Sequence, residues 1–245
     1  MKELANVNGF PIVITRRSRQ RNINLRVRRD STLSITCAKG VPRSEIFTFV
    51  GEQDDFILRA LREYALERAK YPPKKFETGE AFLLLGERLP LQMVWSWNER
   101  IRVLHSEFEI EMTAPLTSSV EERKLALFKY YRKLAKTALI DEVHALSLRM
   151  GLRPSAVSVR GQKTRWGSCS SRGELSLNWK LMAVPAEVRE YVLVHELAHL
   201  QHMNHSPRFW ALVAEHFPNF KNAKRWLREH ETELGVQFQK ISNSL

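Results

Sequence analysis

The feature that most constrains this 245-residue chain is a His-Glu-x-x-His motif formed by His195, Glu196 and His199. In an α-helix, side chains four positions apart lie on the same face, one turn from each other. The motif therefore predicts a helix that presents His195 and His199 to one ion. This spacing is typical of zinc sites in which the glutamate between the histidines acts as a general base on the zinc-bound water.

His205 is the predicted third ligand, because the residues around it end one helix and begin another. Asn204 tolerates the left-handed conformation that often ends helices, and Ser206-Pro207 is typical of an N-cap followed by proline at the first helical position. His205 would then lie in the turn and fold back toward the ion. His202 is the competing ligand, but on a straight helix it would lie too far along the axis.

Apolar residues surround the motif and predict a helix buried on most sides. They are Tyr191, Val192, Leu193, Val194, Leu197, Ala198 and Leu200. Histidines and a glutamate in such a setting cost several kcal/mol unless they are paired or bound to a metal, which disfavours a chance match. A closed structural zinc site is the remaining alternative, but such sites usually have four protein ligands, often cysteines. Three protein ligands would leave one coordination position for water.

With the segments around it, the motif resembles the YgjP-like zinc metallopeptidases, a family related to the SprT-like and WLM zincins. The matching segments are Arg165-Trp166-Gly167-Ser168-Cys169, Leu175-Ser176-Leu177-Asn178, Pro185, the run from Tyr191 to Leu200, Asn204-His205-Ser206 and Phe209-Trp210. This ordered string covers about residues 155 to 220, and a looser similarity begins at Ile23. The resemblance implies one zinc ion at His195, His199 and His205, with Glu196 catalytic. It implies no particular substrate.

The chain carries a net charge of +12 at pH 7, and part of this excess forms a cluster near the N-terminus. The cluster consists of Arg16, Arg17, Arg19, Arg21, Arg26, Arg28 and Arg29. Arg26 and Arg28 alternate with Leu25 and Val27, as on a half-exposed strand. An anionic partner, either nucleic acid or a phosphorylated small molecule, is one interpretation. A solvated face is the other, and it is slightly favoured over nucleic acid because no exposed aromatic residues interleave the arginines.

Cysteine usage and hydrophobicity indicate a reduced, non-membrane environment. Cys37 and Cys169 lack Cys-x-x-Cys spacing, so we expect two reduced thiols, with a metal role for Cys169 as a minor alternative. The hydrophobic content of 43% is enough for a core without disulfides. The first residues lack a signal-peptide pattern, and no stretch reaches membrane-spanning length. We therefore expect a cytoplasmic protein with no membrane partner.

The pattern of elements predicts an α+β fold in two domains. A strand-rich N-terminal module with one helix is expected over residues 1–117, and a zincin-like helical catalytic domain with a small sheet over residues 118–245. Strands are expected within residues 10–37 and at 82–85, 91–97, 101–105, 108–112, 157–159 and 174–179. Helices are expected at 42–70, 117–151, from 185, at 209–217 and at 219–231. Ser119 and Glu122 form a capping box for the long helix, and Gly151 is its stop signal.

The loop from Arg160 to Ser168 and the strand after it supply candidate substrate-binding residues. Lys163 and Arg165 would stabilise an oxyanion or bind phosphate, unless they are only loop charges that face water. By analogy with zincins, the strand from Leu175 to Trp179 would be an edge strand that pairs with an extended peptide, so Leu175 and Leu177 would line the cleft. The alternative is that these leucines only pack the core.

The sequence therefore predicts a zinc-dependent hydrolase, with a metallopeptidase acting on peptides or proteins as the first hypothesis. Glu196 would activate the zinc-bound water. A metal-dependent nucleotide phosphohydrolase of the pyrophosphatase type is the first alternative, because the same water and the excess of arginine suit a phosphorylated substrate. A nucleic-acid-associated, protease-like module is the second, and it depends on the arginine cluster.

Overall fold

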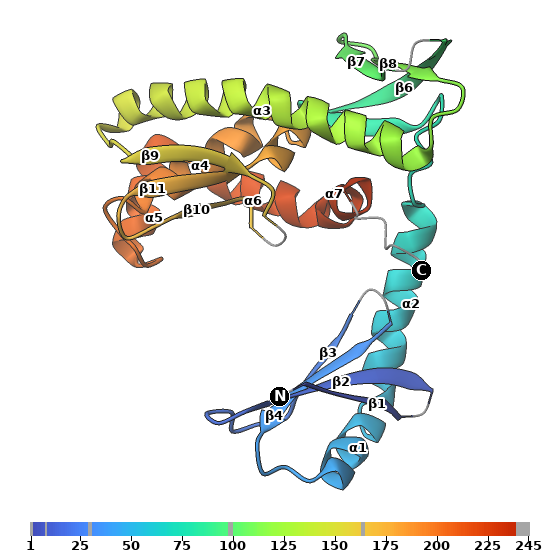
Figure 1. Cartoon of the computed structure of the whole chain (residues 1–245). Helices are drawn as coiled ribbons and strands as arrows, with labels where there is room; N and C mark the ends of the chain where they lie inside the picture. Colours follow the sequence, from blue (N-terminus) through green and yellow to red (C-terminus); the bar gives the residue numbers. More distant parts are fainter. Residues whose placement is uncertain (1, 8, 29–30, 98–99, 163–164, 239–245) are drawn as a thin grey trace. The chain divides into compact units, whose positions relative to one another are not determined.

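The computed structural model describes residues 2–7, 9–28, 31–97, 100–162 and 165–238 (Figure 1). The fold is mixed α+β, as expected from the sequence. The chain forms two compact units, residues 1–72 and residues 73–245, each with its own hydrophobic core. Lys163 lies outside the described residues.

The first unit is a four-stranded sheet with two helices packed against it (Figure 1). Its elements are β1 (Lys2–Val7), β2 (Phe10–Arg17), β3 (Asn24–Val27), β4 (Leu33–Ala38), α1 (Arg43–Gly51) and α2 (Asp54–Lys70), with the strands in the order β1-β2-β4-β3. Alternate strand residues such as Ile14 and Ile35 pack against Ile46 and Ile57 of the helices. The strands β3 and β4, which are consecutive along the chain, pair in antiparallel fashion.

The expected single helix over residues 42–70 is wrong, because two helices occupy this segment. The break lies between Gly51, which has the lowest helix propensity apart from proline, and the acidic pair Asp54 and Asp55. Acidic residues are favoured in the first turn of a helix, because the unpaired N–H groups there carry partial positive charge. The local signals for one helix end and one helix start therefore outweigh the continuous apolar stripe.

The second unit begins with another four-stranded sheet. Its strands are β5 (Ala81–Leu84), β6 (Glu87–Ser96), β7 (Arg102–His105) and β8 (Ile110–Pro115), in the order β5-β6-β8-β7, and they correspond to the four expected strands. Phe82, Leu91 and Met112 of this sheet share one core with Leu127 and Tyr131 of the long helix. The structure therefore divides after Pro72, whereas the sequence-based boundary was drawn at residue 117.

The long helix α3 (Val120–Met150) has both of its expected end signals. The Ser119 hydroxyl accepts a hydrogen bond from the Glu122 backbone N–H, while the Glu122 carboxylate accepts one from the Ser119 N–H. Gly151 ends the helix with φ of 66°, a left-handed conformation in which a side chain would be strained. Residues from Leu127 to Met150 give the helix its buried face.

A three-stranded sheet, one 3₁₀ helix and four α-helices complete the second unit. The elements are β9 (Ala156–Arg160), β10 (Gly167–Cys169), β11 (Glu174–Asn178), the 3₁₀ helix η1 (Trp179–Ala183), α4 (Ala186–Ala198), α5 (Pro207–His216), α6 (Phe220–Glu229) and α7 (Glu231–Gln237). The strand order is β10-β11-β9, so β10, which lies in the expected loop, is an edge strand and β11 is central. Leu175 and Leu177 of β11 are buried in the core.

Two contacts position the N-terminal part of α4, one at its start and one on its side. Gly86, at the turn between β5 and β6, adopts φ of 93°, and a Cβ at this position would lie 2.6 Å from the Pro185 Cα atom. Farther along α4, Arg189 is buried and donates to both carboxylate oxygens of Glu142 in α3, at 2.8 and 2.9 Å. The α4 helix is therefore positioned from both its start and its side before it reaches the His-Glu-x-x-His motif.

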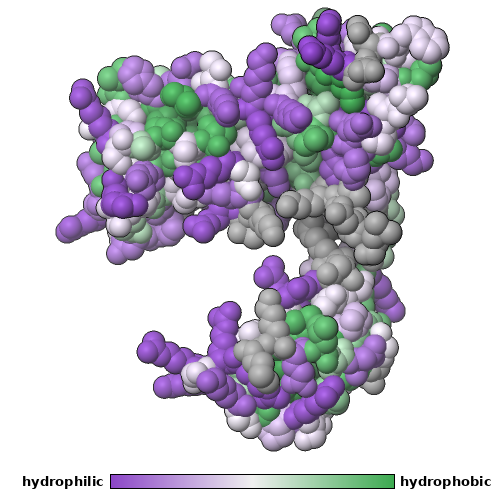
Figure 2. Space-filling view, in the orientation of Figure 1, coloured by the Kyte–Doolittle hydropathy of each residue, from purple (hydrophilic) through white to green (hydrophobic). Residues whose placement is uncertain are grey.

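The surface of the second unit includes hydrophobic area over part of α3, the helix that carries exposed Ile140 and Leu148 (Figure 2). Among the described residues, no helix combines the length and hydrophobicity that a membrane span requires.

Candidate metal centre

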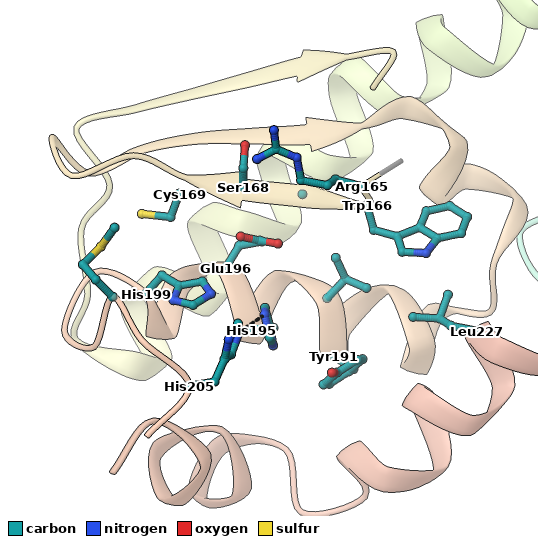
Figure 3. A pocket seen from close by; sticks show the side chains of 13 residues that line it. Arg165, Trp166, Ser168, Cys169, Tyr191, His195, Glu196, His199, His205 and Leu227 are labelled. Atoms are coloured by element: carbon teal, nitrogen blue, oxygen red, sulfur yellow. Dashed lines mark hydrogen bonds between the residues drawn. The ribbon is translucent and has the colours of Figure 1, made fainter. Parts of the chain in front are cut away.

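The candidate metal centre is built by the end of α4 and the connection to α5. His195 projects from the last turn of α4, His199 caps the helix, and His205 lies just before the N-cap of α5 (Figure 3). As expected from the sequence, Ser206 caps α5 by accepting a hydrogen bond from the Phe209 N–H, and Pro207 occupies the first turn. These local signals fix where α5 starts, and hence where the His205 backbone turns.

One potential ligand nitrogen from each of His195, His199 and His205 lies within 4.8 Å of the other two. The Nε2 atoms of His195 and His205 are 3.1 Å apart. Two nitrogens that bind one tetrahedral zinc ion at 2.0–2.1 Å are about 3.4 Å apart, so this pair is already close to a ligating separation. The three imidazoles therefore fit a single zinc ion with small adjustments.

The connection between α4 and α5 also orients His199. Its Nδ1 atom is 3.0 Å from the backbone carbonyl oxygen of His202, which suits an Nδ1–H donor and leaves the Nε2 lone pair for a metal. His202 thus contributes through its backbone, and its side chain is absent from the group of potential ligands formed by the described residues. Asn204 does not adopt the left-handed conformation expected from the sequence, since the described non-glycine residues with positive φ are Ser31, Phe76 and Leu85.

Aromatic side chains of α5 pack against all three imidazoles. The Phe209 ring, which is fully buried, has its centroid 4.9, 4.6 and 4.8 Å from those of His195, His199 and His205. Trp210 stacks on His205 at 5.7 Å with an angle of 25° between the rings. These contacts restrict ring rotation, so the imidazoles are held together even without a shared ion.

Burial governs the protonation of the two central residues of the motif. Burial lowers the pKa of His195 to about 4, and repulsion from His199, His205 and Lys224 acts in the same direction. A neutral imidazole has the free lone pair that a metal requires. Burial raises the pKa of Glu196 to about 7, against the opposing effect of the Arg165 guanidinium. A carboxylate with this pKa is well matched to accept and return a proton near neutral pH.

Glu196 faces β10 across the cleft at the one position where that strand has no side chain (Figure 3). A Cβ on Gly167 would lie 2.6 Å from Glu196 Cγ, 2.7 Å from Oε1 and 2.8 Å from Cδ, which is closer than side-chain atoms pack. The absence of a side chain at residue 167 therefore allows the carboxylate to lie between the metal helix and the edge strand.

The site opens into a cleft of about 440 Å³ that these same elements line. Its lining residues are Arg165, Trp166, Gly167, Ser168, Cys169, Tyr191, Val192, His195, Glu196, His199, Met203, His205 and Leu227. One wall is β10, which among the described strands pairs with β11 alone, so its other edge has no strand neighbour there. Trp166 and Leu227 lie together at one end, away from Cys169 (Figure 3).

The residues expected from the sequence have different positions relative to this cleft. His195, His199, His205 and Glu196 come together in it, and Arg165 lines it. Leu175 and Leu177 do not, because β11 is the central strand and both leucines are in the core, which favours the packing alternative. Cys169 lines the cleft, but the group of potential ligands among the described residues consists of the three histidines.

Sequence reasoning missed two contributors to the site. The strand β10 was placed in a loop because three residues give too short an alternation to detect, although the resemblance marked the same residues as part of an ordered string. The His202 carbonyl was missed because a backbone group carries no signal in residue type.

Comparison with known proteins identifies a family and a solved structure to which the chain is similar. A family model described as YgjP-like, metallopeptidase domain, matches residues 21–230. One matching solved structure is the crystal structure of the metallopeptidase zymogen of Pyrococcus abyssi abylysin, with 26% sequence identity and a TM-score of 0.34; the match covers 37% of this chain and 93% of that chain. No curated protein matches the sequence.

Proposed function

This chain belongs to the YgjP-like metallopeptidase family, and we propose that it is a zinc-dependent peptidase in which His195, His199 and His205 bind the ion. The observation that carries the proposal is the convergence of three imidazole nitrogens beside a buried glutamate in an open cleft. Among the described residues, this group offers three ligands, whereas a closed structural zinc site usually has four.

A bound zinc ion would act as a Lewis acid that polarises the scissile carbonyl and makes water more acidic. Glu196 lies next to the ligands in sequence and in the same cleft, so its carboxylate would accept the proton of the attacking water. It would then return that proton to the leaving nitrogen as the peptide bond breaks. Its pKa of about 7 in the metal-free protein suits both transfers.

The edge strand β10 supports a peptide substrate in preference to a small molecule. Its free edge offers backbone N–H and C=O groups beside the metal centre, to which an extended peptide can add as a further strand. The binding strand is therefore β10, in place of the strand that the sequence suggested. Such pairing uses backbone groups alone and fixes the direction of the substrate relative to Glu196.

Substrate selectivity would come from the apolar end of the cleft. Trp166 and Leu227 supply hydrophobic surface there, and desolvating an apolar side chain contributes about 0.8 kcal/mol per buried methylene. We expect a preference for a large apolar residue near the scissile bond. Arg165 would place its positive charge near the developing oxyanion or near an acidic group of the substrate.

The decisive experiment measures metal content and peptide cleavage on the same preparations. The wild-type protein should contain one zinc ion per chain by elemental analysis and should cleave casein or members of a peptide library. Glu196→Gln should keep the zinc and lose turnover, because the amide cannot accept the proton. His199→Ala should lose the metal as well as the activity.

Nucleoside triphosphates, tested with and without chelator, provide the comparison for the phosphohydrolase alternative. Chelator-sensitive hydrolysis of these nucleotides without cleavage of any peptide would overturn the peptidase assignment. Peptide cleavage that persists in Glu196→Gln would overturn the assigned role of the glutamate.

A further inference from the structure

The sheet of the first unit has one face covered by helices and one face that its helices leave open. Inward residues of β2 and β4, such as Ile12, Ile14 and Ile35, pack against α1 and α2. Because side chains alternate along a strand, the residues between them point to the opposite face. By strand register, that face carries Leu4, Asn6, Pro11, Val13, Thr15, Arg17, Asn24, Arg26, Ser34, Thr36 and Ala38.

Positive charge on this open face comes from exposed arginines. Arg17 ends β2, Arg26 lies in β3 opposite Ser34, and Arg28 follows β3 and donates to the Ser34 hydroxyl at 3.2 Å. Within the described part of the chain, none of these three guanidinium groups is in an ion pair. Arg19 and Arg21, also exposed, lie in the connection between β2 and β3. Thr15, Thr36 and Asn24 place small polar groups among these charges.

The acidic side chains that the structure describes in the same unit lie elsewhere. Among the residues whose side chains are described, Glu45, Glu52, Asp54, Asp55 and Glu63 are all in α1, α2 or the turn between them. Glu3 is the exception, and it points to the helix side, where Arg16 and Arg43 contact its carboxylate at 3.8 and 3.4 Å. A surface that only maintains solubility does not need its positive side chains separated from its negative ones, since a mixture of both keeps a protein soluble as well.

We propose that this open face, defined by Arg17, Arg26 and Arg28 with the polar residues between them, binds the phosphate backbone of nucleic acid without sequence preference. Guanidinium groups form paired hydrogen bonds to phosphate oxygens, and hydroxyl and amide side chains add further donors. The described part of the face has no exposed aromatic side chain for base stacking, so phosphate contacts dominate the interaction.

A membrane surface fits this face less well than nucleic acid does. Interfacial binding to lipid usually combines positive charge with large apolar side chains that insert below the headgroups. Leu4 is the exposed large apolar residue that the described part of this face provides. The arginine, serine, threonine and asparagine side chains on this face instead suit contacts to phosphates.

The test compares two full-length variants of equal charge. Arg17→Gln, Arg26→Gln and Arg28→Gln are combined in the first variant. The control combines Arg59→Gln, Arg62→Gln and Lys70→Gln, which lie exposed on α2 of the same unit. Binding of fluorescent 30-nucleotide single-stranded and double-stranded oligonucleotides is measured across a salt series, with vesicles of phosphatidylserine and phosphatidylcholine as a second probe.

We expect the first variant to bind oligonucleotides at least tenfold more weakly than wild type, and the control to change less than threefold. The slope of log affinity against log salt should fall by about 2 for the single strand, as expected when three phosphate contacts are lost. Equal losses in both variants would mean that only net charge matters and would overturn the proposal. Absence of oligonucleotide binding, or binding to vesicles alone, would also overturn it.

Discussion

At the scale of single residues, the position of the Glu196 carboxylate depends on Gly167, the β10 residue that it faces. Gly167→Ala would add a methyl group 2.6 to 2.8 Å from the glutamate side chain, and the carboxylate would have to move. We expect zinc content to stay unchanged and peptidase kcat to fall at least tenfold, because proton transfer depends on the carboxylate position. Zinc analysis and steady-state kinetics on the same preparation measure both effects.

Gly51→Ala is the matched control for this substitution, since nothing lies within 4 Å of a Cβ at that position. Its kcat should equal that of wild type. Full activity in Gly167→Ala would show that the carboxylate has another accessible position and would contradict the steric argument.

Phe209 packs its ring against all three imidazoles, so their arrangement depends on it. Phe209→Leu would keep an apolar side chain but remove ring contacts to His195, His199 and His205. We expect zinc affinity to fall about tenfold, because rings that rotate more freely lose more entropy on binding. Competition with a chelating dye gives the affinity, and thermal unfolding of the metal-free protein gives the stability.

Val213→Ala is the control, since Val213 is equally buried on α5 and forms part of the core. It should lower the unfolding temperature of the metal-free protein while leaving zinc affinity within about twofold. A comparable loss of affinity in the two variants would show that Phe209 acts only through general packing.

Residue types and spacing were sufficient to locate the candidate ligands and the glutamate, because the side chains that bind metal are few and their helical spacing is fixed. The same information could not identify Gly167 or Phe209 as neighbours of those residues. Glycine and phenylalanine have many structural uses, and their contacts here depend on how β10 and α5 pack against α4.

At the scale of elements, the ion pair between Arg189 and Glu142 joins α4 to α3. Arg189 is buried, whereas about a third of the Glu142 side chain is exposed, so the loss on breaking the pair is smaller than for a fully buried pair. We expect Arg189→Ala to lower the free energy of unfolding by about 2 kcal/mol. Urea denaturation of Arg189→Ala, Glu142→Ala and the double variant measures the coupling between the two residues.

Additive effects of the two single substitutions would contradict a direct interaction. Zinc stoichiometry should stay at the wild-type value in all three variants, since neither residue contacts the imidazoles.

The long helix α3 was predicted well, whereas the three-residue strand β10 was not. The α3 helix has 31 residues and both of its end signals, so its limits follow from local chemistry. The β10 strand has three residues, and its identity as an edge strand depends on pairing with β11, which is not encoded in its own composition. The choice of which strand is central is likewise a property of the whole sheet.

At the scale of the whole molecule, each unit has its own core, so we expect the two units to respond differently to metal removal. The metal centre belongs to residues 73–245, so chelation should lower the unfolding temperature of that unit alone. Ligand binding stabilises the folded state by about 2.7 kcal/mol at a free concentration one hundred times the dissociation constant. Differential scanning calorimetry with EDTA, and after zinc is restored, should show one transition that moves and one that does not.

Truncation tests the division of the chain. We expect residues 73–245 to fold and bind zinc without the first unit, since β5 to β8 share the core of α3 and α4. The sequence-based division predicts that residues 118–245 also fold alone, although they would lack Phe82, Leu91 and Met112 from that core. Circular dichroism and zinc binding of the two fragments distinguish these expectations.

The five residues that connect His199 to His205 set a strict length requirement. They place the His202 carbonyl oxygen beside the His199 imidazole. They also return the chain so that the His205 ring faces the His195 ring. Insertion of a single residue here would turn one of the three ligand nitrogens away from the other two. Surface loops, in contrast, generally tolerate insertions. Homologous chains that share this chemistry should therefore vary in length almost anywhere except in this connection.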